Sequence, residues 1–165
     1  MKTLKKCICV LVINGVLSLV TNVESIKVNH FNLITANSVL TGFLLTSLSM
    51  LLGFLNETII QFFEEAGALK RVYDNIENGI VYSLGSITMS IINVIISEKY
   101  ITNKIVINYL YSLEIMLLVI TLYYLFITIK NLRIIVDSIK LDRMKKRNQK
   151  DVNKDLDKLL NEKYK

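Results

Sequence analysis

Glu114 is the residue of this 165-residue chain with the greatest capacity for chemistry, because it is the one ionisable side chain well inside an apolar segment. Thr121 and Thr128 follow it 7 and 14 positions later, which is the same face of a helix. A carboxylate inside a bilayer is unfavourable unless it is paired, hydrated or protonated, so Glu114 is a functional candidate, and in a pore it would favour cations. The alternative is interfacial, since a span that begins near Leu113 would hold Glu114 at headgroup depth.

Two stripes of small and polar residues accompany this carboxylate, each on one narrow helical face. In the apolar segment 33–55 the stripe consists of Ser38, Gly42, Thr46, Ser49 and Gly53. The second stripe lies in the segment 80–96 and begins one residue before it. It consists of Gly79, Ser83, Ser86, Ser90 and Asn93. Such faces let helix backbones approach closely, and their hydroxyls bond across the interface. The alternative is that one stripe lines a hydrated path through the membrane.

The rest of the sequence contains no pattern that predicts an enzyme. There is no P-loop, no glycine-rich phosphate-binding loop and no spaced cluster of metal ligands, and the single histidine, His30, provides no Ser–His–Asp set. Cys7 and Cys9 supply too few ligands for a metal, so we interpret them as small apolar residues at a helix end. We therefore expect no catalytic residues, no metal and no cofactor.

Four long apolar segments must position these side chains. They cover residues 7–23, 33–55, 80–96 and 105–129. A helix needs about 20 mostly apolar residues to cross the hydrocarbon core, with about 17 as the lower limit. The second and fourth segments exceed this length, and the first and third lie close to the limit. The sequence predicts an all-α membrane protein, with a bundle of four transmembrane helices over residues 1–129.

The charge of the chain is concentrated behind the last apolar segment. Residues 1–129 contain eight Lys and Arg and eight Asp and Glu, whereas residues 130–165 contain twelve and six, so the net charge of +6 lies in the tail. Basic residues next to a span favour the cytoplasmic side, and Lys2, Lys5 and Lys6 mark the N-terminus in the same way. Both termini are therefore predicted to be cytoplasmic, in a bacterial inner membrane, which agrees with an even number of spans.

Two cytoplasmic elements are expected. Residues 56–78 repeat apolar side chains at spacings of three and four beside an acidic face, which predicts an amphipathic linker helix with Gly67 as a weak point. Residues 130–165 are predicted to form a basic helical tail, in which 130–147 continue the fourth helix and 149–165 form a solvated amphipathic helix. The linker would pack against this tail or against another subunit. The basic patch of this tail could anchor the topology, contact anionic lipid, or bind a nucleotide or nucleic acid, and it consists of Lys140, Arg143, Lys145, Lys146 and Arg147.

The first apolar segment has a second interpretation. Three lysines, an apolar stretch and the sequence Val23-Glu24-Ser25 together resemble a signal peptide that would be removed after residue 25. Because an A-x-A pattern is missing and the chain returns to the membrane within about ten residues, we favour a retained helix. Asn14 on this segment is expected to pack against a neighbouring helix.

The span that opens with residues 37–53, the acidic linker and the serine-rich third span together resemble the small multi-pass effectors of bacterial anti-phage systems. These include the transmembrane effectors of CBASS, type III CRISPR and related nucleotide-signalling systems. The resemblance implies a homo-oligomer in the lipid bilayer that gates or disrupts the inner membrane when a nucleotide second messenger, or a partner protein from a neighbouring gene, activates it.

Two other functional classes share this plan. A phage holin has a similar size, several spans and a charged cytoplasmic tail, and it also forms pores. A bacteriocin immunity protein is a binding module and forms no pore. A neighbouring gene for a nucleotidyltransferase, an endolysin or a bacteriocin precursor would distinguish the three.

Overall fold

The computed structural model describes residues 12–18, 23–96 and 103–163, and these residues are almost entirely helical. A short helix covers 12–18, and the chain is all-α, as the sequence predicts. The longer helices are α2 (Val23–Gly53), α3 (Thr58–Glu65), α4 (Ala68–Ile96) and α5 (Lys104–Lys163).

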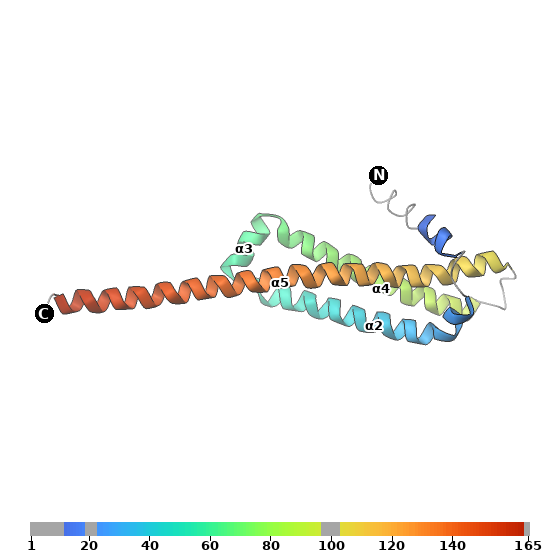
Figure 1. Cartoon of the computed structure of the whole chain (residues 1–165), viewed down its shortest axis with the longest axis horizontal. Helices are drawn as coiled ribbons and strands as arrows, with labels where there is room; N and C mark the ends of the chain where they lie inside the picture. Colours follow the sequence, from blue (N-terminus) through green and yellow to red (C-terminus); the bar gives the residue numbers. More distant parts are fainter. Residues whose placement is uncertain (1–11, 19–22, 97–102, 164–165) are drawn as a thin grey trace.

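The helices α2, α4 and α5 lie side by side and form the bundle (Figure 1). On α4 the buried residues alternate at spacings of three and four from Leu69 to Asn93. On α2 and α5 buried residues recur every seven positions, which is the spacing of helices wound in a left-handed coil. These residues are His30, Asn37, Leu44 and Leu51 on α2, and Glu114, Thr121, Thr128 and Ile135 on α5.

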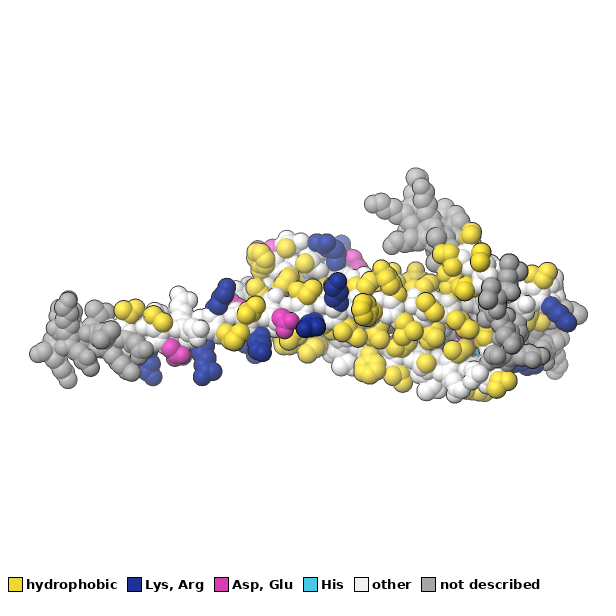
Figure 2. Space-filling view, in the orientation of Figure 1, with side chains coloured by type: hydrophobic (Ala, Val, Ile, Leu, Met, Phe, Trp, Pro, Cys, Tyr) yellow, Lys and Arg dark blue, Asp and Glu magenta, His cyan; other side chains and the backbone are white. Residues whose placement is uncertain are grey.

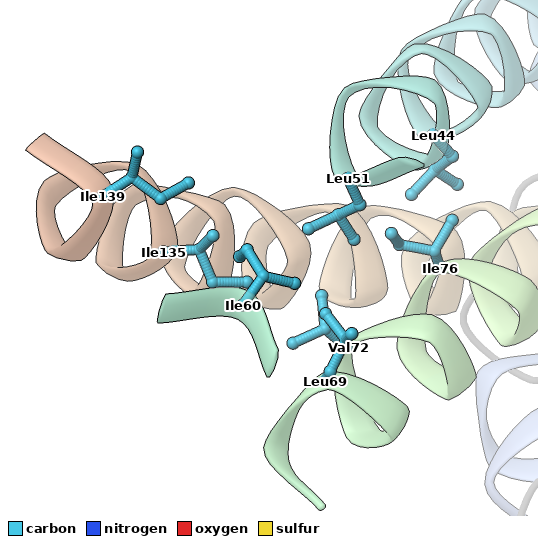
Figure 3. Packing of buried hydrophobic residues seen from close by; sticks show 8 residues of the cluster. All are labelled: Leu44, Leu51, Ile60, Leu69, Val72, Ile76, Ile135 and Ile139. Atoms are coloured by element: carbon cyan, nitrogen blue, oxygen red, sulfur yellow. The ribbon is translucent and has the colours of Figure 1, made fainter. Parts of the chain in front are cut away.

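The interior of the bundle is divided into an apolar half and a polar half. The apolar half lies next to α3, where eight buried side chains from all four longer helices pack together (Figure 3). They are Leu44, Leu51, Ile60, Leu69, Val72, Ile76, Ile135 and Ile139. The polar half lies at the other end of the bundle and contains Glu114. Burial of apolar surface therefore stabilises the bundle mainly through the cluster next to α3.

Gly79 brings α4 close to both of its neighbours. A Cβ atom at this position would lie 2.9 Å from Leu44 Cδ1 and 3.1 Å from Tyr124 Cβ, which is closer than carbon atoms normally approach. At Gly85, two turns away, the nearest atom would be Leu117 Cδ1 at 3.9 Å, an ordinary contact. Only one of the two glycines of α4 is therefore required by the packing.

Three of the described helices are long and apolar enough to cross a membrane, namely Ile26–Gly53, Ala68–Ile95 and Lys104–Lys154. Figure 2 shows hydrophobic side chains over the bundle, whereas Lys, Arg, Asp and Glu side chains gather over α3 and the projecting part of α5. Of the four predicted spans, the third and fourth fall within α4 and α5, and the second, 33–55, extends two residues past the end of α2 at Gly53. The first, 7–23, lies mostly outside the described residues, so the count of four spans stays a prediction.

The linker differs from the single amphipathic helix predicted over 56–78. The helix α3 ends at Glu65, and α4 already begins at Ala68. Gly67 between them has a φ of 65°, a left-handed conformation that glycine adopts without strain, so the predicted weak point is confirmed. The second half of the linker belongs to α4, because Leu69, Val72 and Ile76 are buried in the apolar cluster.

The tail continues the fourth predicted span without interruption, as expected for residues 130–147, and the amphipathic helix predicted from residue 149 is part of the same helix. The helix α5 has 60 residues, which corresponds to about 90 Å, and its C-terminal part projects beyond the bundle (Figure 1). It also packs against the linker, since Arg143 forms an ion pair with Glu57, and Lys146 donates a hydrogen bond of 3.1 Å to Thr58. The predicted contact between linker and tail therefore occurs within one chain.

Candidate functional site: a buried polar centre around Glu114

The carboxylate of Glu114 is fully buried and has partners on both neighbouring helices. His30 Nδ1 lies 2.9 Å from Glu114 Oε2, and Asn93 Nδ2 donates a hydrogen bond of 2.9 Å to the same oxygen. Ser90 donates a hydrogen bond to Glu114 Oε1. Glu114 is therefore an interior residue of the bundle, with a polar partner for each oxygen.

The helices bring these residues together because each lies on the buried stripe of its own helix. Ser90 and Asn93 are three residues apart on α4, so they project from the same face on adjacent turns. His30 lies in the second or third turn of α2, and Glu114 lies about 15 Å along α5. The centre thus forms near the end of the bundle that is remote from α3.

A second polar layer continues the network from the carboxylate toward the apolar half. Ser86 donates a hydrogen bond of 2.9 Å to the main-chain oxygen of Glu114 and accepts one of 2.9 Å from Asn37 Nδ2. Ser83 donates one of 2.8 Å to the main-chain oxygen of Asn37, and Thr41 donates one of 2.7 Å to the Ser83 hydroxyl. A continuous chain of hydrogen bonds therefore joins α2, α4 and α5.

An aromatic ring covers the histidine of the centre. The rings of Tyr111 and His30 are stacked, with centroids 5.0 Å apart. His30 Nε2 and Tyr111 Oη are buried, and neither has a hydrogen-bond partner within the described part of the chain. The centre therefore has unused hydrogen-bonding capacity on the side of the histidine that faces away from the carboxylate.

The short helix 12–18 attaches to the same end of the bundle. Asn14 is fully buried and donates a hydrogen bond of 3.1 Å to the main-chain oxygen of Tyr109, and Ser112 donates one of 2.8 Å to Asn14 Oδ1. The expectation that Asn14 packs against a neighbouring helix is confirmed, and that neighbour is α5.

The two predicted stripes have different environments. Ser83, Ser86, Ser90 and Asn93 are all buried in the centre, where they contact other helices of the same chain. The α2 stripe faces outward, because Ser38, Gly42, Thr46, Ser49 and Gly53 are all exposed. Its hydroxyls bond carbonyls of the preceding turn of α2, as in the 2.8 Å hydrogen bond from Thr46 to Gly42. The two stripes are alike in composition, but only the α4 stripe belongs to the buried centre.

The partner of Glu114 was missed by the sequence interpretation. His30 precedes the predicted second span, 33–55. The sequence interpretation weighs it only as a possible catalytic or metal-binding residue, not as a partner of Glu114. The helix α2 begins ten residues before that span, at Val23, so His30 lies on a helix face. Its spacing of seven residues to Asn37 and fourteen to Leu44 is the signal that could have placed it on the buried stripe.

The basic patch lies at the opposite end of the bundle from the centre. Arg143 and Lys146 contact the linker, and Lys146 also forms an ion pair of 2.8 Å with Asp142. Lys140 and Arg147 line a cavity of about 310 Å³ between α5 and the end of α2. Lys145 is exposed and does not line this cavity.

Taken with the fold, these observations define a class of protein: an all-α chain with three helices able to cross a membrane, packed around a buried His–Glu pair. In the described residues, no group of three or more His, Cys, Asp and Glu side chains is arranged to hold a metal ion. Comparison with protein-family models, curated proteins and solved structures finds no match. The chemistry available to the centre is that of a carboxylate and an imidazole, which can share a proton or attract a cation.

Proposed function

We propose that this chain is a homo-oligomeric membrane effector that conducts cations, or opens a cation-permeable leak, in a bacterial inner membrane. The observation that carries the proposal is the burial of Glu114 with His30 inside a helix bundle of transmembrane length. Ionisable residues within membrane spans are rare and usually mark ion or proton pathways.

Packing alone does not account for this centre. Replacing two hydrogen-bonded buried partners by apolar groups of the same shape is often nearly neutral or stabilising, so the His30–Glu114 contact is weak evidence for a structural role. A bundle that needed only to cohere could extend the apolar cluster of the other half through these layers. The presence of a carboxylate, an imidazole and several hydroxyls in these layers supports a role in handling charge.

Conduction requires more than one subunit in this proposal. Among the described residues, the interior of the apolar half consists of buried apolar side chains, so one bundle offers no continuous polar path along its axis there. The outward α2 stripe provides a face on which another copy can pack closely, since no atom lies within 4 Å of a Cβ built at Gly42 or Gly53. Closed rings are the usual arrangement of identical subunits around an axis.

The proposed setting is bacterial anti-phage defence, with activation from the side of α3 and the tail. The projecting part of α5 supports this, because it offers a surface away from the membrane where a messenger-dependent partner could act. A neighbouring nucleotidyltransferase gene would agree with this setting. A neighbouring endolysin gene would instead favour timed lysis.

The experiment is a cation-flux assay with the purified oligomer in liposomes. The variant is Glu114→Gln, which keeps the size and hydrogen-bonding capacity of the side chain but removes its charge. The control is Thr121→Val, an equally buried and nearly isosteric change on the same face of α5. We expect Glu114→Gln to lower the cation-to-anion selectivity at least several-fold, with assembly intact, and Thr121→Val to leave it unchanged.

Two results would contradict the proposal. The first is a wild-type oligomer that makes the liposomes permeable without any preference for cations over anions. The second is a Glu114→Gln oligomer with the flux and selectivity of the wild type, because the carboxylate would then have no part in the path. Size-exclusion chromatography of every variant separates these outcomes from a failure to assemble.

A further inference from the structure

We propose that the groove between the end of α2 and α5 binds the anionic headgroup of an acidic phospholipid from the leaflet on the α3 side. The groove is a cavity of about 310 Å³, which is at the lower end of the usual range for small-molecule sites. It lies at the other end of the bundle from the Glu114 centre, and the inference does not rest on conduction.

The lining of the groove has the two chemistries of a phospholipid. Phe54, which directly follows α2, forms its apolar wall together with Val136, Ile139 and Met144 from α5. Lys140, Arg143 and Arg147 form its basic side. These three cations are spaced by three and four residues, so they project from one face of α5 over successive turns. The planar guanidinium groups suit a phosphate, which accepts two parallel hydrogen bonds from an arginine.

The basic side has positive charge available for a ligand. Arg143 is partly neutralised by its ion pair with Glu57. Lys140 and Arg147 are exposed, and no acidic side chain of the described residues forms an ion pair with either of them. An anion bound between these two residues would therefore meet uncompensated cations.

The position of the groove selects a lipid rather than a soluble anion. The apolar span of α2 ends at Gly53, and Phe54 follows directly, so the groove opens where a membrane-spanning helix leaves the hydrocarbon. On α5 the stretch without charged residues ends at Lys130, which lies ten residues, or about 15 Å, before Lys140. We take the end of α2 as the level of the headgroup phosphates, where the apolar wall can contact the upper part of an acyl chain and Lys140 and Arg147 reach the phosphate from the side of the tail.

A second cavity near the same end serves as a comparison. It measures about 390 Å³, is lined by residues of α3, α4 and α5, and contains Arg71 as its single cation. Its lining lacks the pair of uncompensated charges that Lys140 and Arg147 provide. Size alone therefore does not distinguish the proposed site, whereas its charge does.

The test measures lipid binding to the purified full-length protein in a neutral detergent. Phosphatidylglycerol and phosphatidylcholine are titrated separately, and bound lipid is counted by native mass spectrometry. The variant is the double substitution Lys140→Gln and Arg147→Gln. The control is Lys145→Gln with Lys150→Gln, which removes the same charge from exposed positions of α5 that do not line the cavity.

We expect the wild-type protein to prefer phosphatidylglycerol over phosphatidylcholine. Each basic residue near an anionic surface contributes about fivefold in affinity, so the double variant should bind phosphatidylglycerol about 30-fold more weakly. The control variant should stay within a few-fold of the wild type. Circular dichroism of each variant checks that α5 remains helical.

Three results would overturn the proposal. Equal weakening by the variant and its control would mean that the tail attracts anions without a defined site. Equal affinity of the wild type for the two lipids would exclude a headgroup charge preference. Competition by inorganic phosphate or ATP at the concentration of the lipid would show that the groove takes a soluble phosphate instead of a lipid headgroup.

Discussion

Replacing Gly79 by alanine tests the close packing of α4 against both of its neighbours. The added methyl group would lie 2.9 Å from Leu44 Cδ1, which can rotate away, and 3.1 Å from Tyr124 Cβ, which is fixed close to its backbone. Overpacking of this kind costs about 1–3 kcal/mol, and we place Gly79→Ala in the upper half of that range because one of its contacts cannot relax. Alanine gains about 1 kcal/mol over glycine in a helix interior. The expected net loss is therefore about 1–2 kcal/mol in the free energy of unfolding.

Gly85→Ala is the matched control for this prediction. It lies on the same helix, and its nearest contact, Leu117 Cδ1 at 3.9 Å, needs no rearrangement. It should keep the helix-propensity gain of about 1 kcal/mol, so the two variants should differ by about 2–3 kcal/mol. Unfolding in mixed micelles of increasing SDS fraction, followed by circular dichroism, measures both. If Gly79→Ala were as stable as Gly85→Ala, the close approach of α4 to α2 and α5 would be refuted.

Three further predictions concern the buried centre, a buried hydroxyl and the topology. His30→Leu leaves the buried carboxylate of Glu114 without its imidazole partner and should lower the free energy of unfolding by about 3–5 kcal/mol. The double variant His30→Leu with Glu114→Leu should recover most of that loss. Equal stability of the single and double variants would contradict the pairing. Thr128→Val removes a buried hydroxyl that has no partner in the described chain, so stability should stay unchanged or rise by about 1 kcal/mol, and a loss above about 1 kcal/mol would reveal a missing partner. A reporter enzyme fused to the C-terminus should be active only in the cytoplasm, and a periplasmic signal would contradict the topology inferred from the tail.

Hydropathy predicted the presence of the helices better than their ends. The apolar segments located α2, α4 and α5, because lipid-facing positions must be apolar along the whole membrane thickness. The third apolar segment, 80–96, begins twelve residues after the start of α4 at Ala68. The backbone hydrogen bonds of a helix continue past the apolar boundary, and residues such as Lys70 and Asp74 extend α4 with their side chains exposed. Gly67, in contrast, was identified correctly because its effect is local to the backbone.

The composition of the two stripes predicted which helix faces are polar, but not which helix lies opposite each face. Periodicity within one helix identifies which residues share a face, and it correctly grouped Thr121 and Thr128 with Glu114. It contains no information on which face of which helix lies opposite. The α2 and α4 stripes therefore could not be distinguished as outward and inward, and the His30–Glu114 contact, which joins residues 84 positions apart, could not be predicted.

The unbroken course of α5 gives the protein the mechanics of a lever. The chain contains no proline, and α5 runs without interruption from the level of Glu114 to Lys163, a distance of about 70 Å. A tilt of about 5° around the level of Glu114 displaces the far end by about 6 Å over that length. Conversely, a force on the far end of the tail acts on the bundle with a larger force over a smaller distance, because the arm inside the bundle is shorter than the arm outside it. The contact of Arg143 with Glu57 ties this arm to the linker, so rotation of the rod also pulls on the helix that joins the first two membrane-length segments.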